Sequence, residues 1–503
     1  MESKSERHTL ALLSLAMPII GMTVSRMLMG FIDFIMVSRL GTEAQAAISP
    51  ATILVFALAC LGMGAAQSIQ TFVSQADGRG EPEQGGAYAW QTYYLAIACG
   101  IATLPFVLTS GAWVGGIASL AHHDPGVAKL ELDYIAIGLW SVAPATICAG
   151  LNGFFMGVQR ARIGLISVIV SLVVNVIGNY LLIFGKFGFP EMGIAGAALA
   201  TVIGWAARAA VLTWAMLLPS IDARFHTRRS MALSWEKLRG ILKIGGPTSV
   251  QWLIDIGSWV VFMAVIVPPY GTEAMAASNV VLQFMHLSFM PAIGIGIALC
   301  TQTGFAIGEG RPDVAALKAR VAIRVTGAYM GVIGLLFLFG RYPLMRLMVV
   351  DGDTAVLDMG AQVLIWAAIF QVFDAMGITY MNALRGAGDT RVPAIMVTFC
   401  CWGIFIGGGL LMSRYAPGLG IHGPWMMCTL YISVLGLLLL WRYKLGHWRN
   451  IKLFDQSRAG SAAQLDLDPT SDEAPQTDLA AACADENVAP LPGAMAEPGV
   501  RDR

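Results

Sequence analysis

Three carboxylates lie inside long apolar runs of this 503-residue sequence. Asp33, Asp255 and Asp374 each have apolar side chains on both sides. An ionisable side chain inside a membrane-spanning helix costs at least about 2.5–3.5 kcal/mol, so such residues usually bind an ion or a substrate. A carboxylate in this setting can bind Na⁺, hold a proton or pair with a cationic ligand. The structural alternative is an ion pair between helices, with Arg26 or Arg208 as the basic partner.

Two asparagines accompany Asp33 in the N-terminal half. Asn175 and Asn179 are one helical turn apart, so their amides project from one face of a helix. They can offer oxygens to a cation or donate hydrogen bonds to Asp33, and Asn152 and Thr201 complete the predicted polar cluster. Polar contacts that hold helices together, worth about 0.6–2 kcal/mol each, explain the same residues without an ion.

Polar side chains also recur in the C-terminal half. We expect Asp255 and Asp374 to share a second polar cavity, whose other members are Asn279, Gln283, His286 and Gln371. A lone histidine inside a membrane also serves as a packing residue, so a role for His286 in coupling is one of two explanations. The sequence thus predicts a Na⁺ site at Asp33, or at Asp255 and Asp374 together, with a proton as the alternative coupling ion.

The elements that position these residues are membrane-spanning helices. Hydrophobic residues make up 56% of the chain and charged residues 13%, against about 25% charged residues in soluble domains. Apolar runs of the length that crosses a bilayer, about 20 residues, predict an all-α polytopic membrane protein with twelve spans. The expected spans are residues 10–38, 46–74, 89–113, 133–157, 163–185, 193–218, 239–268, 276–305, 321–341, 358–383, 391–412 and 421–443. Pro18 removes a helix hydrogen bond upstream of Asp33 and is the predicted hinge of the first span.

The chain contains an internal duplication. The sequence Gly-Thr-Glu-Ala at 41–44 returns at 271–274, 230 positions later, and Gly78 and Gly80 return as Gly308 and Gly310. Each half has six expected spans, an even number, so both halves begin and end on the same side of the membrane. We therefore expect two parallel six-helix repeats related by an axis along the membrane normal, a design typical of transporters.

The predicted organisation has five parts. They are a cytoplasmic N-terminus (1–9), an N-lobe with six spans (10–218), a cytoplasmic linker (219–238), a C-lobe with six spans (239–443) and a largely disordered, acidic cytoplasmic tail (444–503). The loops on the side of the linker carry most of the Lys and Arg residues outside the spans. Because basic loops stay on the cytoplasmic side, we expect a multi-pass inner-membrane protein with both termini in the cytoplasm.

The sequence lacks the signatures of common enzymes. It contains no G-x-x-x-x-G-K-[ST], no H-E-x-x-H and no G-x-S-x-G, and it has no C-x-x-C. We therefore expect neither enzymatic activity nor a cofactor beyond a coupling ion, and no nucleic-acid partner.

Five segments carry a family resemblance: AMPII at 16–20, DFIMVSRLG at 33–41, NVIGNYLLIFG at 175–185, GIAGAA at 193–198 and ALRGAGDTR at 383–391. Together they resemble the multidrug and toxic compound extrusion (MATE) transporters, in particular the NorM-like branch of that family. The resemblance implies two six-helix lobes around a central cleft. It also implies that Asp33 and Asp374 match the acids of the first and tenth helices. Two positions depart from the pattern, since Asp255 replaces a glutamate of the seventh helix and Phe370 replaces a tyrosine near Asp374.

The expected function is efflux of small organic, cationic compounds across the inner membrane by antiport with Na⁺ or H⁺, carried out by a monomer embedded in the lipid bilayer. One alternative is a flippase for lipid-linked precursors, which would be expected to have a basic cavity for phosphate. Others are an exporter dedicated to one metabolite and a membrane scaffold or sensor that transports nothing.

Overall fold

The computed structural model describes residues 4–120, 123–349 and 353–454. Within these residues, twelve helical segments are long and apolar enough to cross a membrane, which agrees with the predicted number of spans. The helices of the first half are α1 (Lys4–Ser38), α2 (Thr42–Gln67), α3 (Ile69–Gly78), α4 (Pro82–Leu108), α5 (Ser110–Leu120), α6 (Pro125–Gly138), α7 (Val142–Gly157), α8 (Ala161–Ile183) and α9 (Gly193–Met216).

The second half repeats this plan. After the short α10 (Pro219–Phe225), its helices are α11 (Trp235–Val261), α12 (Thr272–Gly308), α13 (Pro312–Phe339), α14 (Arg341–Arg346), α15 (Thr354–Ala387), α16 (Arg391–Thr398), α17 (Gly408–Tyr415) and α18 (His422–Lys444). Short 3-10 turns lie at Leu139–Ser141, Lys186–Gly188, Pro268–Tyr270, Pro417–Leu419 and His447–Asn450. Two π-helical segments, Phe262–Ile266 and Phe399–Gly407, interrupt the seventh and eleventh spans.

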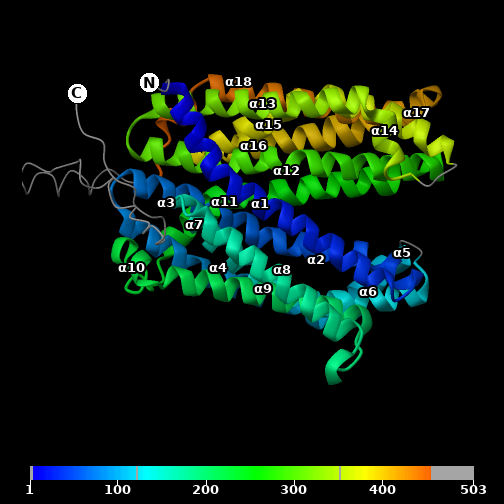
Figure 1. Ribbon diagram of the computed structural model, residues 1–503, viewed down its shortest axis with the longest axis horizontal. Coiled ribbons are helices and arrows are strands. Elements are labelled where there is room, and N and C mark those ends of the chain that lie inside the picture. The colour runs from blue at the N-terminus through cyan, green and yellow to red at the C-terminus, as the bar shows by residue number, and fades with distance from the viewer. Residues whose placement is uncertain (1–3, 121–122, 350–352, 455–503) are drawn as a thin grey trace, which may run out of the picture. The chain divides into compact units, whose positions relative to one another are not determined.

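The helices group into two lobes. In Figure 1, α2, α4, α8 and α9 lie together in the lower half of the view, and α12, α13, α15 and α18 lie together in the upper half. Each lobe has its own apolar core. In the C-lobe this core includes Phe262, Phe370 and Trp425, and in the N-lobe it includes Ile48, Ile135 and Leu139.

Equivalent residues of the two halves make equivalent contacts between the lobes. A Cβ atom built on Gly78 would lie 2.1 Å from the carbonyl oxygen of Phe305, and one built on Gly308 would lie 2.2 Å from that of Gln75. Both the glycines and their partners are 230 positions apart, so one contact is the image of the other. Only glycine allows two helices to approach this closely.

A pair of hydrogen bonds shows the same relation. The Thr71 hydroxyl donates to the carbonyl oxygen of Arg385 at 3.0 Å, and the Thr301 hydroxyl donates to that of Met156 at 3.1 Å. Thr71 and Thr301 occupy equivalent positions of the two halves. These reciprocal contacts confirm the two parallel six-helix repeats expected from the sequence.

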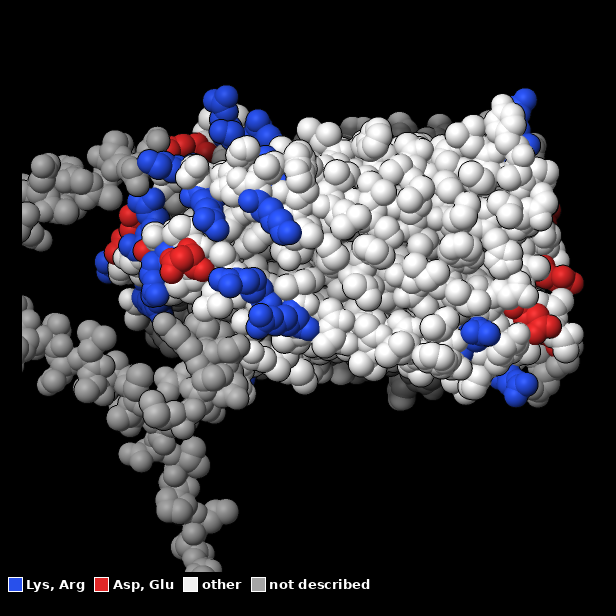
Figure 2. Space-filling view, turned by 90° about the horizontal axis from the view of Figure 1, so that it is seen from above, with Lys and Arg blue, Asp and Glu red and all other residues white. Residues whose placement is uncertain are grey.

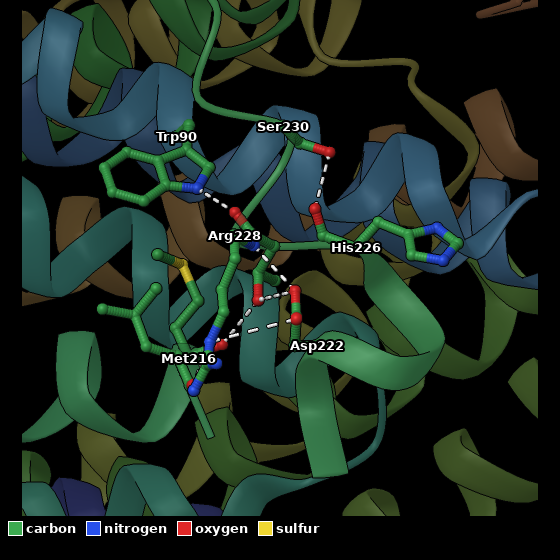
Figure 3. Close-up of polar contacts among 8 residues, drawn as sticks. Trp90, Met216, Asp222, His226, Arg228 and Ser230 are labelled. Carbon is green, nitrogen blue, oxygen red and sulfur yellow. Dashed lines mark hydrogen bonds and ion pairs between the residues drawn. The ribbon is translucent and has the colours of Figure 1, made fainter. Parts of the chain in front are cut away.

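The segment that joins the lobes, residues 219–238, forms hydrogen bonds with the N-lobe and within itself. Figure 3 shows its polar contacts, in which the Trp90 indole of α4 donates to the carbonyl oxygen of Thr227 at 2.5 Å. The Asp222 carboxylate accepts the backbone N–H of Arg228 at 2.8 Å, and the Ser230 hydroxyl donates to the carbonyl oxygen of His226 at 2.9 Å. The predicted linker therefore packs against α4.

Charged side chains concentrate at the ends of the helices. Figure 2 shows a broad uncharged band between two ends, with Lys and Arg side chains gathered mainly at one of them. The loops after α3 and α12, which carry Arg79 and Arg311, meet at one end because Gly78 contacts Phe305 there. An uncharged band bordered by charge is the surface that a bilayer requires.

Several boundaries differ from the sequence-based prediction; the fourth span, for example, begins at Pro125 and not at residue 133. The third span ends at Leu108 and not at residue 113, because the backbone turns at Thr109, and the Thr109 hydroxyl donates to the carbonyl oxygen of Pro105 at 2.7 Å. At the other end of the chain, Trp448 is buried and stacks on Tyr443, so the ordered part continues beyond the start of the predicted tail. The remainder of that tail, residues 455–503, lies outside the described residues.

Candidate ion and substrate site

Asp33 is the end of a chain of polar side chains that crosses the N-lobe. The Asn179 amide on α8 donates a hydrogen bond to the Asp33 carboxylate on α1, and it also donates to the Asn175 amide oxygen at 3.3 Å. The Asn175 amide in turn donates to the Thr201 hydroxyl on α9 at 3.4 Å. Both asparagines are fully buried, whereas Asp33 is partly exposed. The helical spacing of 175 and 179 thus places both amides on the face that meets α1 and α9.

A cavity of about 190 Å³ lies beside this chain. Its polar lining includes Asp33, Thr52, Tyr134 and Thr201 together with the basic Arg26 and Arg208, and the apolar walls include Val55, Phe56 and Met63. The Thr52 hydroxyl donates to the Tyr134 hydroxyl at 3.3 Å. The carboxylate therefore faces an interior space with further oxygen atoms within it.

A second N-lobe cavity, of about 90 Å³, adjoins the first one. The two share Arg26, Met63, Trp205 and Arg208 as lining residues. Asn152 lines this second cavity and not the first, so the structure separates it from the Asp33 chain. Its amide oxygen is buried and accepts no hydrogen bond from the described residues.

The C-lobe acids lie together in a cavity of about 380 Å³. Asp255 on α11 and Asp374 on α15 both line it, as do Trp259, Arg385 and Tyr431. The Cys401 thiol, in the second π-helical segment, donates to Asp255 at 3.9 Å. Asp374 forms no hydrogen bond with the described residues. Two neighbouring carboxylates in a poorly hydrated space repel each other, which favours a bound cation or a shared proton.

The C-lobe cavity also adjoins the N-lobe. Gln67, Trp252 and Ile297 line both this cavity and the smaller N-lobe cavity. The three cavities are therefore neighbours, linked by shared lining residues, with Asp33 at the one in the N-lobe and Asp255 and Asp374 at the one in the C-lobe. Adjoining cavities in the two halves suit a substrate site between lobes that move.

Comparison with known proteins identifies the family. The MatE family model matches residues 18–181 and 253–409, which is most of both lobes. This chain belongs to the MatE family. Membership makes it a membrane transporter and not an enzyme, as the sequence indicated.

Individual relatives cover the MatE chain almost completely. It is 30% identical over 447 residues to the "Probable multidrug resistance protein NorM" of Rhizobium meliloti (strain 1021), covering 87% of this chain and 93% of that protein. The protein of the same name from Idiomarina loihiensis is 28% identical over 461 residues, covering 88% and 95%. Among solved structures, an outward-facing multidrug resistance MATE family transporter matches with a TM-score of 0.79 at 19% identity, covering 88% of this chain and 97% of that one.

The remaining predicted cavity residues of this MatE transporter lie elsewhere. Gln371 is fully buried and its amide donates to the Ser288 hydroxyl at 3.1 Å. Asn279, Gln283 and His286 are exposed on α12 and do not line the cavity that holds Asp255 and Asp374. The buried stripe of α12 instead runs through Ser278, Val281, Met285 and Ser288. The predicted row is rotated from this stripe by roughly one residue, or about 100°.

Tyr431 and Trp205 line cavities of this MatE transporter, although the sequence did not identify them as lining residues. Tyr431 on α18 reaches the cavity of Asp255 and Asp374, where it brings a hydroxyl into the lobe in which Phe370 replaces the family tyrosine. Trp205 lies on α9 in an ordinary apolar run, and its position between two cavities depends on how the helices pack. The spacing of Trp205 and Arg208, three residues apart on one helix, is the one local hint that they share a face.

Proposed function

We propose that this transporter exports small organic compounds, including cations, across the inner membrane in exchange for Na⁺ or H⁺. The observation that carries the proposal is the buried chain from Asp33 through Asn179 and Asn175 to Thr201, which opens onto an interior cavity. The names of the NorM relatives support multidrug substrates.

Asp33 is the proposed coupling residue. Besides the Asp33 carboxylate, the side-chain oxygen of Asn179 can bind a cation. This oxygen is buried and accepts no hydrogen bond from the described residues. A buried acceptor without a partner costs about 1–3 kcal/mol, and a cation beside Asp33 would remove this cost. The same carboxylate can bind a proton instead, and either form of charge neutralisation alters its attraction for the Asn179 amide.

Asp255 and Asp374 are the proposed contacts for cationic substrate groups, with a Na⁺ ion or a proton as the competing occupant. Trp259 and Tyr431 add aromatic faces to the same cavity. A cation over an aromatic ring gains about 0.5–2 kcal/mol in a poorly hydrated site. Competition between substrate and coupling ion for one pair of acids is a direct route to exchange, because the two cannot occupy the site together.

Movement of the lobes completes the proposal. The Gln75 amide donates to the carbonyl oxygen of Gly386 at 3.0 Å, and the Gln70 amide donates to the Thr301 hydroxyl at 2.8 Å, so hydrogen bonds join the lobes beside the basic end. Breaking these bonds would open the interior at that end. Pro18 lies within α1 and is the proposed hinge through which a charge change at Asp33 bends this helix.

The proposed orientation places the end rich in Lys and Arg in the cytoplasm, by the rule that basic loops stay inside. Both termini are then cytoplasmic. A monomer suffices for the proposed cycle, because the ion site, the substrate site and the moving lobes belong to one chain.

The test is efflux of ethidium from cells or inverted vesicles under an imposed Na⁺ gradient or an imposed H⁺ gradient. We expect one of the two gradients to drive efflux by the wild type and not by Asp33→Asn. The Thr103→Ala variant is the matched control, since Thr103 is a buried polar residue of the same lobe whose hydroxyl donates to the carbonyl oxygen of Cys99 on its own helix at 2.7 Å. Efflux by Asp33→Asn at the wild-type rate would contradict the proposal.

A further inference from the structure

Two arginines lie in the interior of the N-lobe. Arg26 is in the first span and Arg208 is in the sixth, and both line the two N-lobe cavities. Arg208 is 5% exposed. The guanidinium carbon of each lies 5.6 Å from the centroid of the Trp205 ring. The indole therefore interacts with two positive charges at once.

No carboxylate of the described residues forms an ion pair with either arginine. The Arg208 Nε donates to the Ser167 hydroxyl at 3.4 Å, and neither arginine forms an ion pair with a described Asp or Glu residue. Asp33 accepts its hydrogen bond from Asn179 instead. The ion pair that the sequence allowed between Asp33 and these arginines is thus not formed, and two guanidinium groups face one carboxylate across the N-lobe interior.

Unpaired charge at this depth is expensive. An arginine at the centre of a membrane-spanning helix costs at least about 2.5 kcal/mol, and two guanidinium groups close together repel each other. Interaction with an aromatic face returns about 0.5–2 kcal/mol. A bound anion would offset the remainder, because a guanidinium group forms two parallel hydrogen bonds to a carboxylate.

The duplication allows the charge of Arg26 to be compared with the charge at the equivalent position of the other half. Pro18 and Pro247 are equivalent positions of the two halves, 229 residues apart, and the same offset relates Arg26 to Asp255. One repeat thus carries a positive side chain where the other carries a negative one, and both side chains line the central cavities.

We propose that Arg26 and Arg208 form a binding site for the carboxylate group of an organic anion. Two guanidinium groups and one carboxylate leave one net positive charge in the N-lobe interior, which matches a monoanion better than a diphosphate. Part of the neighbouring wall suits an apolar or aromatic body, since Ile19, Met22, Met63 and Met156 line the smaller cavity together with Trp205, beside the polar Thr23, Gln67, Gln70 and Asn152. The ligand class is therefore an aromatic or aliphatic monocarboxylate.

This site is separate from the proposed exchange of cations. It binds through the N-lobe arginines in the absence of any ion gradient, so its test does not depend on coupling at Asp33. A compound with both a carboxylate and an amine can contact both lobes, with its anionic end at Arg26 and Arg208 and its cationic end at Asp255 and Asp374.

The test is equilibrium binding of 2-naphthoate and of its neutral isostere 2-naphthamide to the purified full-length protein. We expect the wild type to bind the carboxylate at least about ten-fold more tightly, since hydrogen bonds to charged groups contribute about 1.5–3 kcal/mol. Arg208→Gln and Arg26→Gln should each lose this preference while 2-naphthamide binding stays unchanged. Unchanged binding of the amide also reports that the variant is folded.

Arg385→Gln is the matched control, because Arg385 is a buried arginine that lines the C-lobe cavity. It should retain the preference for 2-naphthoate. Three results would each overturn the site: equal affinities of the wild type for acid and amide, loss of the preference only in Arg385→Gln, or displacement of 2-naphthoate by chloride at equal concentration. The last result would identify a site for small inorganic anions.

Discussion

In the N-lobe, the carboxylate of Asp33 has a buried amide partner on a neighbouring helix, and the two arginines of the interior line the same cavity as this carboxylate. In the C-lobe, Asp255 and Asp374 share one cavity, and the only hydrogen-bond donor to either carboxylate among the described residues is the thiol of Cys401, at 3.9 Å. The two lobes descend from one repeat and retain its contacts, but their polar interiors differ in charge. Duplication thus preserved the positions of the helices while the side chains at their centres diverged.

The backbones differ in the same places. Within the described residues, π-helical segments occur only in the C-lobe, at Phe262–Ile266 and Phe399–Gly407. The first follows the helix of Asp255, and the second contains Cys401. π-Helical turns often lie at functional sites, and here the second one carries the thiol that contacts Asp255. The N-lobe instead achieves its site with regular helices and an asparagine pair at helical spacing.

The largest expected effect is that of replacing Asp33, the proposed coupling acid, compared with replacing Asp255, a proposed substrate contact. Asp33→Asn should reduce gradient-driven ethidium efflux at least about 100-fold, because a neutral amide neither releases a proton nor offers a full charge to Na⁺. Asp255→Asn should reduce efflux less while raising the ethidium concentration needed for half-maximal rate. Initial rates over a series of ethidium concentrations measure both quantities. Equal loss of maximal rate in the two variants would remove the distinction between the lobes.

The next effect concerns the partner of Asp33. Asn179→Ala removes a hydrogen bond to a charged group, which contributes about 1.5–3 kcal/mol. We expect the concentration of coupling ion at half-maximal efflux to change at least about ten-fold. Thr103→Ala, which removes a buried hydroxyl that bonds only within α4, should leave it unchanged. A response of both variants to the same extent would indicate general damage to the N-lobe.

A smaller effect tests the symmetry of the lobe contacts. Gly78→Ala and Gly308→Ala each place a methyl group against a carbonyl oxygen of the other lobe, at 2.1 and 2.2 Å before any relaxation. Overpacking of this kind costs about 1–3 kcal/mol. The two variants should lower the midpoint of thermal unfolding by similar amounts, whereas Gly327→Ala, within α13 and with open space around the added methyl group, should leave it nearly unchanged. Dissimilar effects of Gly78→Ala and Gly308→Ala would show that the duplicated contacts have different roles.

The smallest effect concerns the departure from the family pattern in the C-lobe. Phe370 is fully buried in the apolar core of this lobe. Phe370→Tyr would bury a hydroxyl without an evident partner and should lower stability by about 1–3 kcal/mol, with no gain in ethidium affinity. Tyr431→Phe should weaken ethidium binding instead, because Tyr431 lines the cavity of both acids. Binding titrations and thermal unfolding of the two variants separate these outcomes.

The sequence was sufficient for the number of spans, the duplication and the bond between Asp33 and Asn179. Long apolar runs and the spacing of 175 and 179 are local properties, and they determine which face of a helix is polar. The cavity lining in the C-lobe was harder to predict. Asn279, Gln283 and His286 form a polar row on α12, but the face of α12 that packs inward depends on α13 and α15, which the row itself does not encode. The sequence also could not decide whether Arg26 or Arg208 pairs with Asp33. That pairing depends on distances between side chains of different helices, which local spacing does not determine.

The most direct test of coupled exchange is ion movement driven by the substrate. Proteoliposomes loaded with ethidium and diluted into ethidium-free buffer should take up ²²Na⁺, or acidify inside as reported by a pH-sensitive dye, while ethidium leaves. The account predicts that one of these two ion movements accompanies efflux in the wild type and is absent in Asp33→Asn. Ethidium efflux with neither ion movement, or ion uptake that persists in Asp33→Asn, would contradict antiport through this residue.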